Sequence, residues 1–166
     1  MASDFYKLDR IDIKILTELQ KNARLSNVNL AESVGLSPSP CLQRVKKLEK
    51  AGYIESYNAR LSIGRLAKHV LVFTEVKLHN HRREDFVKFE TEIRKYDSIL
   101  ECHLVGGGFD YLLKFVTRNI GHYQEVIEDI LERQIGVRNY FSYVVIKSVI
   151  AKDDVAIDVI LPEGES

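Results

Sequence analysis

Apolar residues at the start of the chain recur with the period of an α-helix. Leu8, Ile11, Ile15 and Leu19 are three or four residues apart, so they share one helical face. The pattern stops close to Asn22. It predicts a first helix whose apolar side packs against other elements.

Two further helices are predicted at short intervals. Asn27 can cap a short helix over residues 28–34, and a glycine-containing turn follows it. Ser37 and Pro38 mark the start of a third helix, because Ser can accept a hydrogen bond from the first turn and Pro needs no N–H partner there. Gly52 marks its end. Two helices joined by a tight turn are the layout of a helix-turn-helix.

The third helix has an apolar face and a basic face. Cys41, Val45 and Leu48 share the apolar side, which predicts packing against the first two helices. The opposite side carries Ser39, Gln43, Lys46, Lys47 and Lys50. A charged stripe alone is more often a solvated surface than a binding site. Its place in a helix-turn-helix is what favours DNA, and an extended segment over residues 53–61 fits a small wing.

From residue 69 the pattern changes to the two-residue period of a β-strand, which residues 69–79 follow. The later segments predict a helix over 82–96, strands over 99–105 and 111–117, a helix over 120–134 and a long strand over 137–150. The order βαββαβ is that of a ferredoxin-like domain, in which two helices cover one face of an antiparallel sheet. Apolar side chains on the other face predict a dimer formed through sheet faces or edges.

The predicted fold class is therefore α+β, with a winged helix-turn-helix followed by a ferredoxin-like domain. The expected divisions are a DNA-binding domain at 1–62, a linker at 63–68, the ferredoxin-like domain at 69–152 and an acidic tail at 153–166. A length of 166 residues is enough for one core or two small ones.

Charge is unevenly distributed along a chain whose formal net charge is zero. Residues 1–62 contain ten Lys and Arg against seven Asp and Glu, a balance of +3, which leaves −3 for the remainder. Residues 151–166 hold five acidic residues against one Lys. The basic N-terminal part is suited to bind a polyanion, and the neutral to acidic C-terminal part is expected to have a different function.

The sequence gives little support for disulfides, a metal site, a catalytic site or a membrane segment. Cys41 and Cys102 occur singly, so we expect two reduced thiols and no disulfide framework. His79 and His81 lack further ligands at a suitable spacing, so no metal site or cofactor is predicted. There is no nucleophile elbow or phosphate loop, which argues against an enzyme. No signal-peptide core or long apolar run is present, and we expect a cytoplasmic protein without a membrane segment.

Several longer motifs lie in the order of a known family. They are residues 8–12 (LDRID), 22–27 (NARLSN), 36–41 (LSPSPC) and 107–114 (GGFDYLLK). With these the chain resembles the Lrp/AsnC family of prokaryotic transcription factors, and within it the leucine-responsive regulators, through residues 101–105 and 109–111. The resemblance implies a helix-turn-helix linked to an amino-acid-sensing domain. It also implies homodimers that assemble further, with an octamer as the expected form, in the nucleoid.

The helix-turn-helix geometry selects candidate contacts to double-stranded DNA. They are Arg24, Ser39, Pro40, Gln43, Arg44, Lys46, Lys47 and Lys50. Gln43 is the best candidate to read a base, because its amide can pair bidentately with adenine. Ser39 and Lys46 also lie toward the bases, whereas Lys47, Lys50 and Arg24 suit phosphates. Arg44 lies toward the packed side of the helix, so the sequence is compatible with two roles for it, an internal salt bridge or a phosphate contact.

The glycine-rich turn offers a candidate effector site. Gly106, Gly107 and Gly108 can simply form a hairpin, yet three glycines exceed what a turn requires. They would let backbone N–H groups approach an α-carboxylate, while Asp110 could pair with an α-ammonium group. The resemblance implies an effector pocket at this turn with contacts from neighbouring subunits. Gly108 departs from the bulkier or polar residue of close relatives, which leaves side-chain specificity open.

Ile120 and Tyr143 are weaker candidates for the effector pocket, since such residues are more often core. The function expected is a sequence-specific transcription regulator modulated by an amino acid such as leucine. Two alternatives are an amino-acid-metabolising enzyme with a regulatory ferredoxin-like domain and a DNA-architectural protein that ignores ligand.

Overall fold

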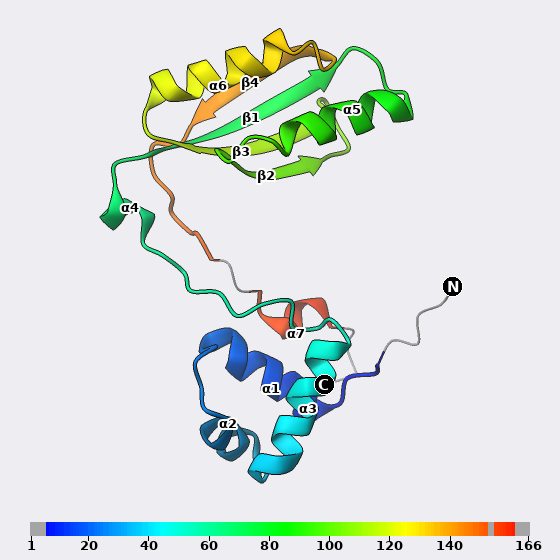
Figure 1. The fold of residues 1–166 in the computed structure, drawn as a ribbon, viewed down its shortest axis with the longest axis vertical. Helices are drawn as coiled ribbons and strands as arrows, with labels where there is room; N and C mark the ends of the chain where they lie inside the picture. Colours follow the sequence, from blue (N-terminus) through cyan, green and yellow to red (C-terminus); the bar gives the residue numbers. More distant parts are fainter. Residues whose placement is uncertain (1–5, 153–154, 162–166) are drawn as a thin grey trace. The chain divides into compact units, whose positions relative to one another are not determined.

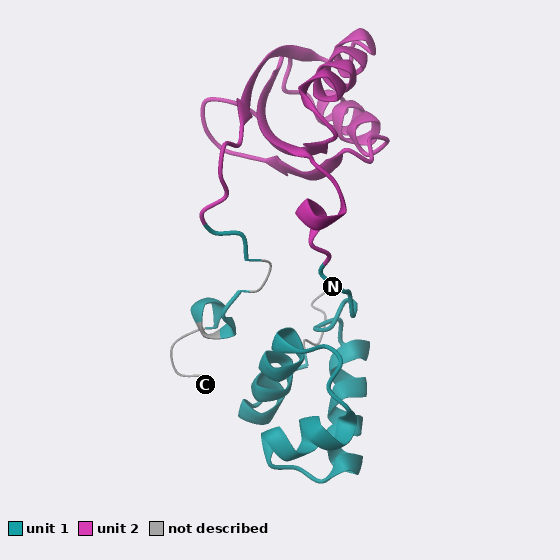
Figure 2. Ribbon diagram, turned by 90° about the vertical axis from the view of Figure 1, so that its left-hand side faces the viewer, with its two compact units in different colours: residues 1–60, 150–166 teal, residues 61–149 magenta. Residues whose placement is uncertain are grey.

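The structure is a computed structural model that describes residues 6–152 and 155–161. Internal contacts divide the chain into two units (Figure 2), residues 1–60 with 150–166 and residues 61–149. Each unit has its own core of buried side chains. Of the predicted acidic tail, residues 153, 154 and 162–166 lie outside the described residues.

Three helices build the first unit, α1 (Arg10–Lys21), α2 (Asn27–Val34) and α3 (Pro38–Lys50). Their apolar faces meet in one cluster, in which Ile15, Cys41 and Leu48 are completely buried. The predicted helical periods and the packed side of the third helix are confirmed. A short helix, α7 (Ile157–Ile160), was not predicted.

The helix caps differ in part from those predicted. Ser26, not Asn27, caps α2 and accepts a hydrogen bond from the Asn29 N–H at 3.2 Å. Ser37 occupies the cap position of α3, but its side chain makes no capping hydrogen bond. At α2 the neighbouring residues Ser26 and Asn27 have similar capping propensity, and the path of the chain into the helix decides between them.

The chain between the units contains little regular structure. Residues 54–62 form neither helix nor strand, so the segment predicted to be extended at 53–61 has no strand pairing. A single helical turn, α4 (Ile63–Leu66), follows it and was not predicted. Leu66 is 71% exposed, so the apolar residues of this turn are not arranged on a buried face and the sequence shows no helical period there.

The second unit is a four-stranded antiparallel sheet with two helices (Figure 1). Its elements are β1 (Val70–Leu78), α5 (Arg83–Ile93), β2 (Ile99–Leu104), β3 (Tyr111–Thr117), α6 (Ile120–Glu132) and β4 (Val137–Val144). The strand order is β2-β3-β1-β4, and both helices lie on the same side of the sheet (Figures 1 and 2). The predicted βαββαβ order and ferredoxin-like arrangement are confirmed.

β4 is shorter than the predicted strand over residues 137–150. It pairs with β1 up to Val144, and the Val145 N–H donates to the Leu71 carbonyl at 2.9 Å. Because β1 begins at Val70, further residues of β4 have no partner strand. Ile146 is fully exposed. It is a residue type that favours strands, yet it lies outside the sheet.

The two faces of the sheet differ sharply in burial. Under α5 and α6 lie Val72, Val76, Leu113 and Phe115, all buried. Thr74 is buried too, and its hydroxyl lies 2.8 Å from the Tyr123 hydroxyl of α6, which also hydrogen-bonds Ser142. The opposite face is here called the open face, and strand register places on it Leu71, Phe73, Glu75, Lys77, Glu101, His103, Leu112, Lys114, Val116, Phe141 and Tyr143.

The described residues lack both a helix suited to span a membrane and a cluster of side chains suited to hold a metal. Within residues 6–152 and 155–161, no helix combines the length and apolar character needed to cross a membrane. In the same part of the chain, no three His, Cys, Asp or Glu side chains are grouped to hold a metal ion.

Candidate DNA-binding and effector-binding sites

The outer surface of α3 carries most of the predicted DNA contacts. Exposed residues in the first unit include Arg24, Ser39, Pro40, Gln43, Lys46, Lys47 and Lys50. Leu42, which follows the buried Cys41, is 43% exposed and adds an apolar group to this surface. Such a surface offers hydrogen-bond donors for phosphates and one amide for a base edge.

The turn between α2 and α3 is fixed by hydrogen bonds. Gly35 adopts the left-handed conformation with φ 76°, and the Leu36 N–H donates to the Ala31 carbonyl at 2.8 Å. The Asn27 side-chain amide donates to the Pro38 carbonyl at 2.7 Å, which links the starts of the two helices. The exposed side of α3 is thereby held at one angle to α2.

Arg44 takes part in an ion-pair network with α1. Its guanidinium lies 2.7 Å from the carboxylates of both Asp9 and Asp12, and Asp12 is completely buried. Tyr6 donates a further hydrogen bond to Asp12 at 2.8 Å. These contacts raise the pKa of Arg44, the hydrogen bond to Asp12 most strongly. Of the two roles left open for Arg44, the internal salt bridge is the one observed here.

The acidic partners of Arg44 were not among the predicted site residues. Burial alone would raise the pKa of Asp9, but the Asp12 N–H and the Arg44 guanidinium outweigh it and lower that pKa. The available signal was the two acids three residues apart, which form a capping box at the start of α1.

Lys47 is in contact with the chain ahead of α1. Its ammonium group lies 5.3 Å from the centre of the Tyr6 ring, within cation–π range. The Tyr53 hydroxyl donates to the Tyr6 carbonyl at 2.6 Å, so Tyr6 is held from two sides. Lys47 remains exposed and presents its charge at the edge of the α3 surface.

The glycine-rich turn joins β2 to β3 and is open to solvent. A Cβ placed on Gly106, Gly107 or Gly108 would meet no atom within 4 Å. Only Gly107 of the three has a positive φ, at 158°. The local backbone therefore does not require glycine at all three positions, which leaves close approach of a ligand as a reason for the other two.

Asp110 is anchored at the end of this turn. Its carboxylate accepts the Leu78 N–H at 2.7 Å and lies 3.0 Å from the His81 Nε2. Burial would raise the pKa of Asp110, but the hydrogen bonds from Leu78 and His81 lower it overall. Lys77 donates to the Gly108 carbonyl at 3.3 Å, so β1 and its end hold the turn from one side. The carboxylate is kept ionised and fixed in direction.

Within one chain, the other two predicted effector residues lie away from the turn. Ile120 is 40% exposed at the start of α6, at the far end of β3 from Gly108. The seven residues of β3 span about 20 Å in a strand. Tyr143 is 52% exposed on the open face, opposite Phe73. A pocket containing all of them needs residues from more than one subunit.

An exposed helix-turn-helix joined to a separate ferredoxin-like unit with an open glycine turn defines a DNA-binding regulator with a ligand-binding domain. Residues 8–55 match the winged helix-turn-helix DNA-binding family, and residues 71–155 match the Lrp/AsnC ligand binding domain. The chain belongs to the Lrp/AsnC family of transcription regulators.

Individual relatives agree with this assignment. The leucine-responsive regulatory protein of Escherichia coli K12 is 46% identical over 142 residues, covering 86% of this chain and 87% of the relative. The transcriptional regulatory protein DoeX of Halomonas elongata is 44% identical over 143 residues, covering 86% and 90%. A transcriptional regulator of Neisseria meningitidis, solved with L-Met, has a TM-score of 0.86 at 35% identity, covering 93% and 100%.

The predicted class is thereby confirmed. The chain is a transcription regulator with a DNA-binding helix-turn-helix and a domain for a small-molecule effector, and it is not an enzyme.

Proposed function

We propose that this regulator responds to a free amino acid bound at the glycine-rich turn, with DNA affinity or assembly as the output. The observation that carries the proposal is the pairing of an open run of glycine N–H groups with the ionised, fixed carboxylate of Asp110. These groups complement the two charged ends of an amino acid. One relative is named leucine-responsive and another was solved with L-Met, which supports a neutral amino acid as effector.

DNA recognition is assigned to the exposed side of α3. Gln43 is proposed to read adenine, with Ser39 and Lys46 beside it, while Lys47, Lys50 and Arg24 bind phosphates. Pro40 lies among them on the same exposed turn. Arg44 contributes by holding α3 against α1, and any phosphate contact would use the part of its guanidinium left free by Asp9 and Asp12.

Assembly is proposed to proceed through the open face of the sheet. Phe141 is 59% exposed and Tyr143 is 52% exposed on it, and contact with a second copy would remove both from water. A dimer supplies the two half-site readers that one small module lacks. Further association, to an octamer, would bring Ile120 and Tyr143 of neighbouring subunits toward the glycine turn.

The proposed divisions of labour are DNA binding by residues 1–62, a linker at 63–68, sensing and assembly by 69–152 and an acidic tail at 153–166. The proposed place of action is the nucleoid of the cytoplasm, where the DNA target lies.

The test combines operator selection with effector titration. Wild-type protein is expected to enrich one DNA sequence from a random pool, and leucine or methionine is expected to change its affinity or its size in solution. The variant Asp110→Asn keeps an acceptor for the Leu78 N–H but loses the charge, so it is expected to bind DNA normally and ignore the amino acid. An unchanged effector response in this variant would contradict the assignment of Asp110. No response of the wild type to any amino acid would favour the architectural alternative.

A further inference from the structure

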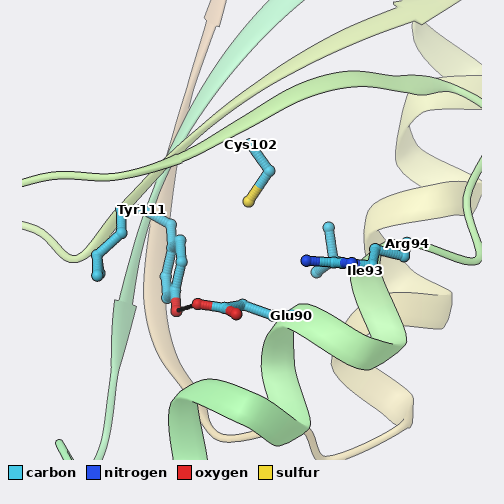
Figure 3. A pocket seen from close by; sticks show the side chains of 6 residues that line it. Glu90, Ile93, Arg94, Cys102 and Tyr111 are labelled. Atoms are coloured by element: carbon cyan, nitrogen blue, oxygen red, sulfur yellow. Dashed lines mark hydrogen bonds between the residues drawn. The ribbon is translucent and has the colours of Figure 1, made fainter. Parts of the chain in front are cut away.

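A hollow in the ligand-binding unit lies between α5 and the edge of the sheet, apart from the glycine turn. It has a volume of about 250 Å³. Its walls are Glu90, Ile93, Arg94, Cys102, Leu104 and Tyr111. Figure 3 shows Glu90 and Arg94 extending from α5, and Cys102 and Tyr111 reaching the same space from the strands.

The two charged residues of this hollow are one helical turn apart and do not pair with each other. Glu90 and Arg94 have the i, i+4 spacing and order that favour an ion pair on a helix. Instead, Glu90 accepts a hydrogen bond from the Tyr111 hydroxyl at 2.8 Å, as Figure 3 shows. The Arg94 backbone N–H donates to the Glu90 carbonyl, but among residues 6–152 and 155–161 its guanidinium makes no hydrogen bond or ion pair. The hollow thus separates a fixed anion from an available cation.

The remaining walls are apolar and sit close to the charges. Ile93 is buried, Leu104 is 60% exposed, and the ring of Tyr111 is packed against Phe89 with a 4.5 Å separation of ring centres. Burial raises the pKa of the Cys102 thiol to about 11, Glu90 adds to the shift, and Arg94 opposes it. The charges of Glu90 and Arg94 therefore both act on the thiol, which stays protonated at neutral pH.

We infer that this hollow is a second binding site for a small zwitterion, a free aliphatic amino acid. Arg94 binds the α-carboxylate, the unshared oxygen of Glu90 binds the α-ammonium group, and Leu104 with Ile93 contacts the side chain. A cavity of this size is small for a drug-sized ligand, which agrees with a metabolite of a few heavy atoms. The site goes beyond the proposed effector site because it shares none of its residues.

Cys102 provides a direct reporter of occupancy. Cys41 is completely buried, whereas Cys102 is exposed, so a thiol reagent added to the folded protein modifies Cys102 first. Leucine bound in the hollow is expected to slow this reaction several-fold at saturation, at a fixed, mildly alkaline pH. 4-Methylpentanoate and 3-methylbutylamine, each retaining one of leucine's two charges, are expected to leave the rate unchanged. Protection by either analogue, or none by leucine, would overturn the proposal.

Two variants test the charges. Arg94→Gln and Glu90→Gln are each expected to weaken protection by about tenfold, the effect of one lost charge-assisted hydrogen bond. Arg94→Lys is expected to restore part of it. Arg83→Gln is the matched control, because Arg83 is exposed on the same helix and lies outside the hollow. Full protection in Arg94→Gln would contradict the assignment.

A separate variant distinguishes this site from the glycine turn. Asp110→Asn is expected to lose the DNA-binding response to the amino acid and to keep the protection of Cys102. Loss of protection in Asp110→Asn, with protection retained in Arg94→Gln, would assign the effect to the glycine turn and overturn the second site. The analogue comparison on the wild-type protein decides the matter even if a variant fails to fold.

Discussion

At the scale of single residues, the DNA-binding unit depends on one arginine that faces inward. Arg44 connects α3 to two acids of α1, and one of these, Asp12, has no access to water. A buried carboxylate without its cation is costly, which is a stronger constraint than the attraction of an exposed pair. The helix that presents the basic surface is therefore held against α1 by the ion pairs of Arg44.

Arg44→Ala is expected to lower the free energy of unfolding of the first unit by about 3 kcal/mol, because Asp12 is left buried without a cation. Urea denaturation followed by circular dichroism measures the change. The control is Asp9→Asn, which keeps the capping acceptor and alters a side chain that is 50% exposed. It is expected to cost less than half as much. Equal losses in the two variants would contradict the dominant role of Asp12.

Asp110 has a residue-scale signature in its pH dependence. Its pKa in the folded protein is below the ordinary value of 3.8, so its contribution to stability is complete above that value and is lost as pH falls through the lowered pKa. Asp110→Asn is expected to be less stable than wild type by about 1 kcal/mol at neutral pH. The difference should shrink in acid. Thermal unfolding at a series of pH values measures it, and a gap that widens in acid would contradict the assigned hydrogen bonds.

At the scale of elements, the pattern of apolar residues was sufficient for most of the fold. β1 alternates from Leu71 to Leu78 because one face is buried under helices, and α1 and α3 repeat at helical spacing because one side of each packs against the other helices. The end of β4 could not be predicted, since it depends on where its partner β1 begins. The cap of α2 was misplaced by one residue, because Ser26 and Asn27 have similar propensity and only the path of the chain separates them.

The same limit applies to the candidate sites. The exposed residues of α3 follow from its period, whereas the partners of Arg44 and Asp110 come from elsewhere in the chain. His81 lies 29 positions before Asp110, and no local pattern joins them. The hollow beside Cys102 combines residues of one helix and two strands, so periodicity alone did not reveal it.

The two serine positions make a matched test at the element scale. Ser26→Ala removes an observed cap of α2 and is expected to lower the free energy of unfolding by about 1 kcal/mol. Ser37→Ala is expected to change it by only a few tenths, since that side chain makes no capping bond. Chemical denaturation of both variants gives the comparison. A larger loss in Ser37→Ala would restore the capping role predicted from sequence.

At the scale of the whole molecule, the open face of the sheet is the surface through which we propose that a second copy binds. Charged and aromatic side chains are mixed on it. Lys114 of the central strand β3 lies 2.6 Å from Glu101, while Phe141 and Tyr143 expose aromatic surface on the edge strand β4. Contact with a second copy would take this aromatic surface out of water. In this proposal the DNA and effector functions are coupled through assembly, since a second copy would complete both.

Phe141→Lys is expected to shift the protein from dimers and larger assemblies to monomers, because each proposed interface would bury two added ammonium groups in place of two aromatic rings. Sedimentation velocity over a range of concentrations measures the change. The matched control is Val87→Lys, which introduces the same charge at a residue that is 54% exposed on α5, on the helical side of the sheet. The monomeric variant should keep its fold, bind single half-sites weakly and lose cooperative operator binding. If Val87→Lys dissociates the assembly and Phe141→Lys does not, the subunits associate through the helical side and the open face has another role.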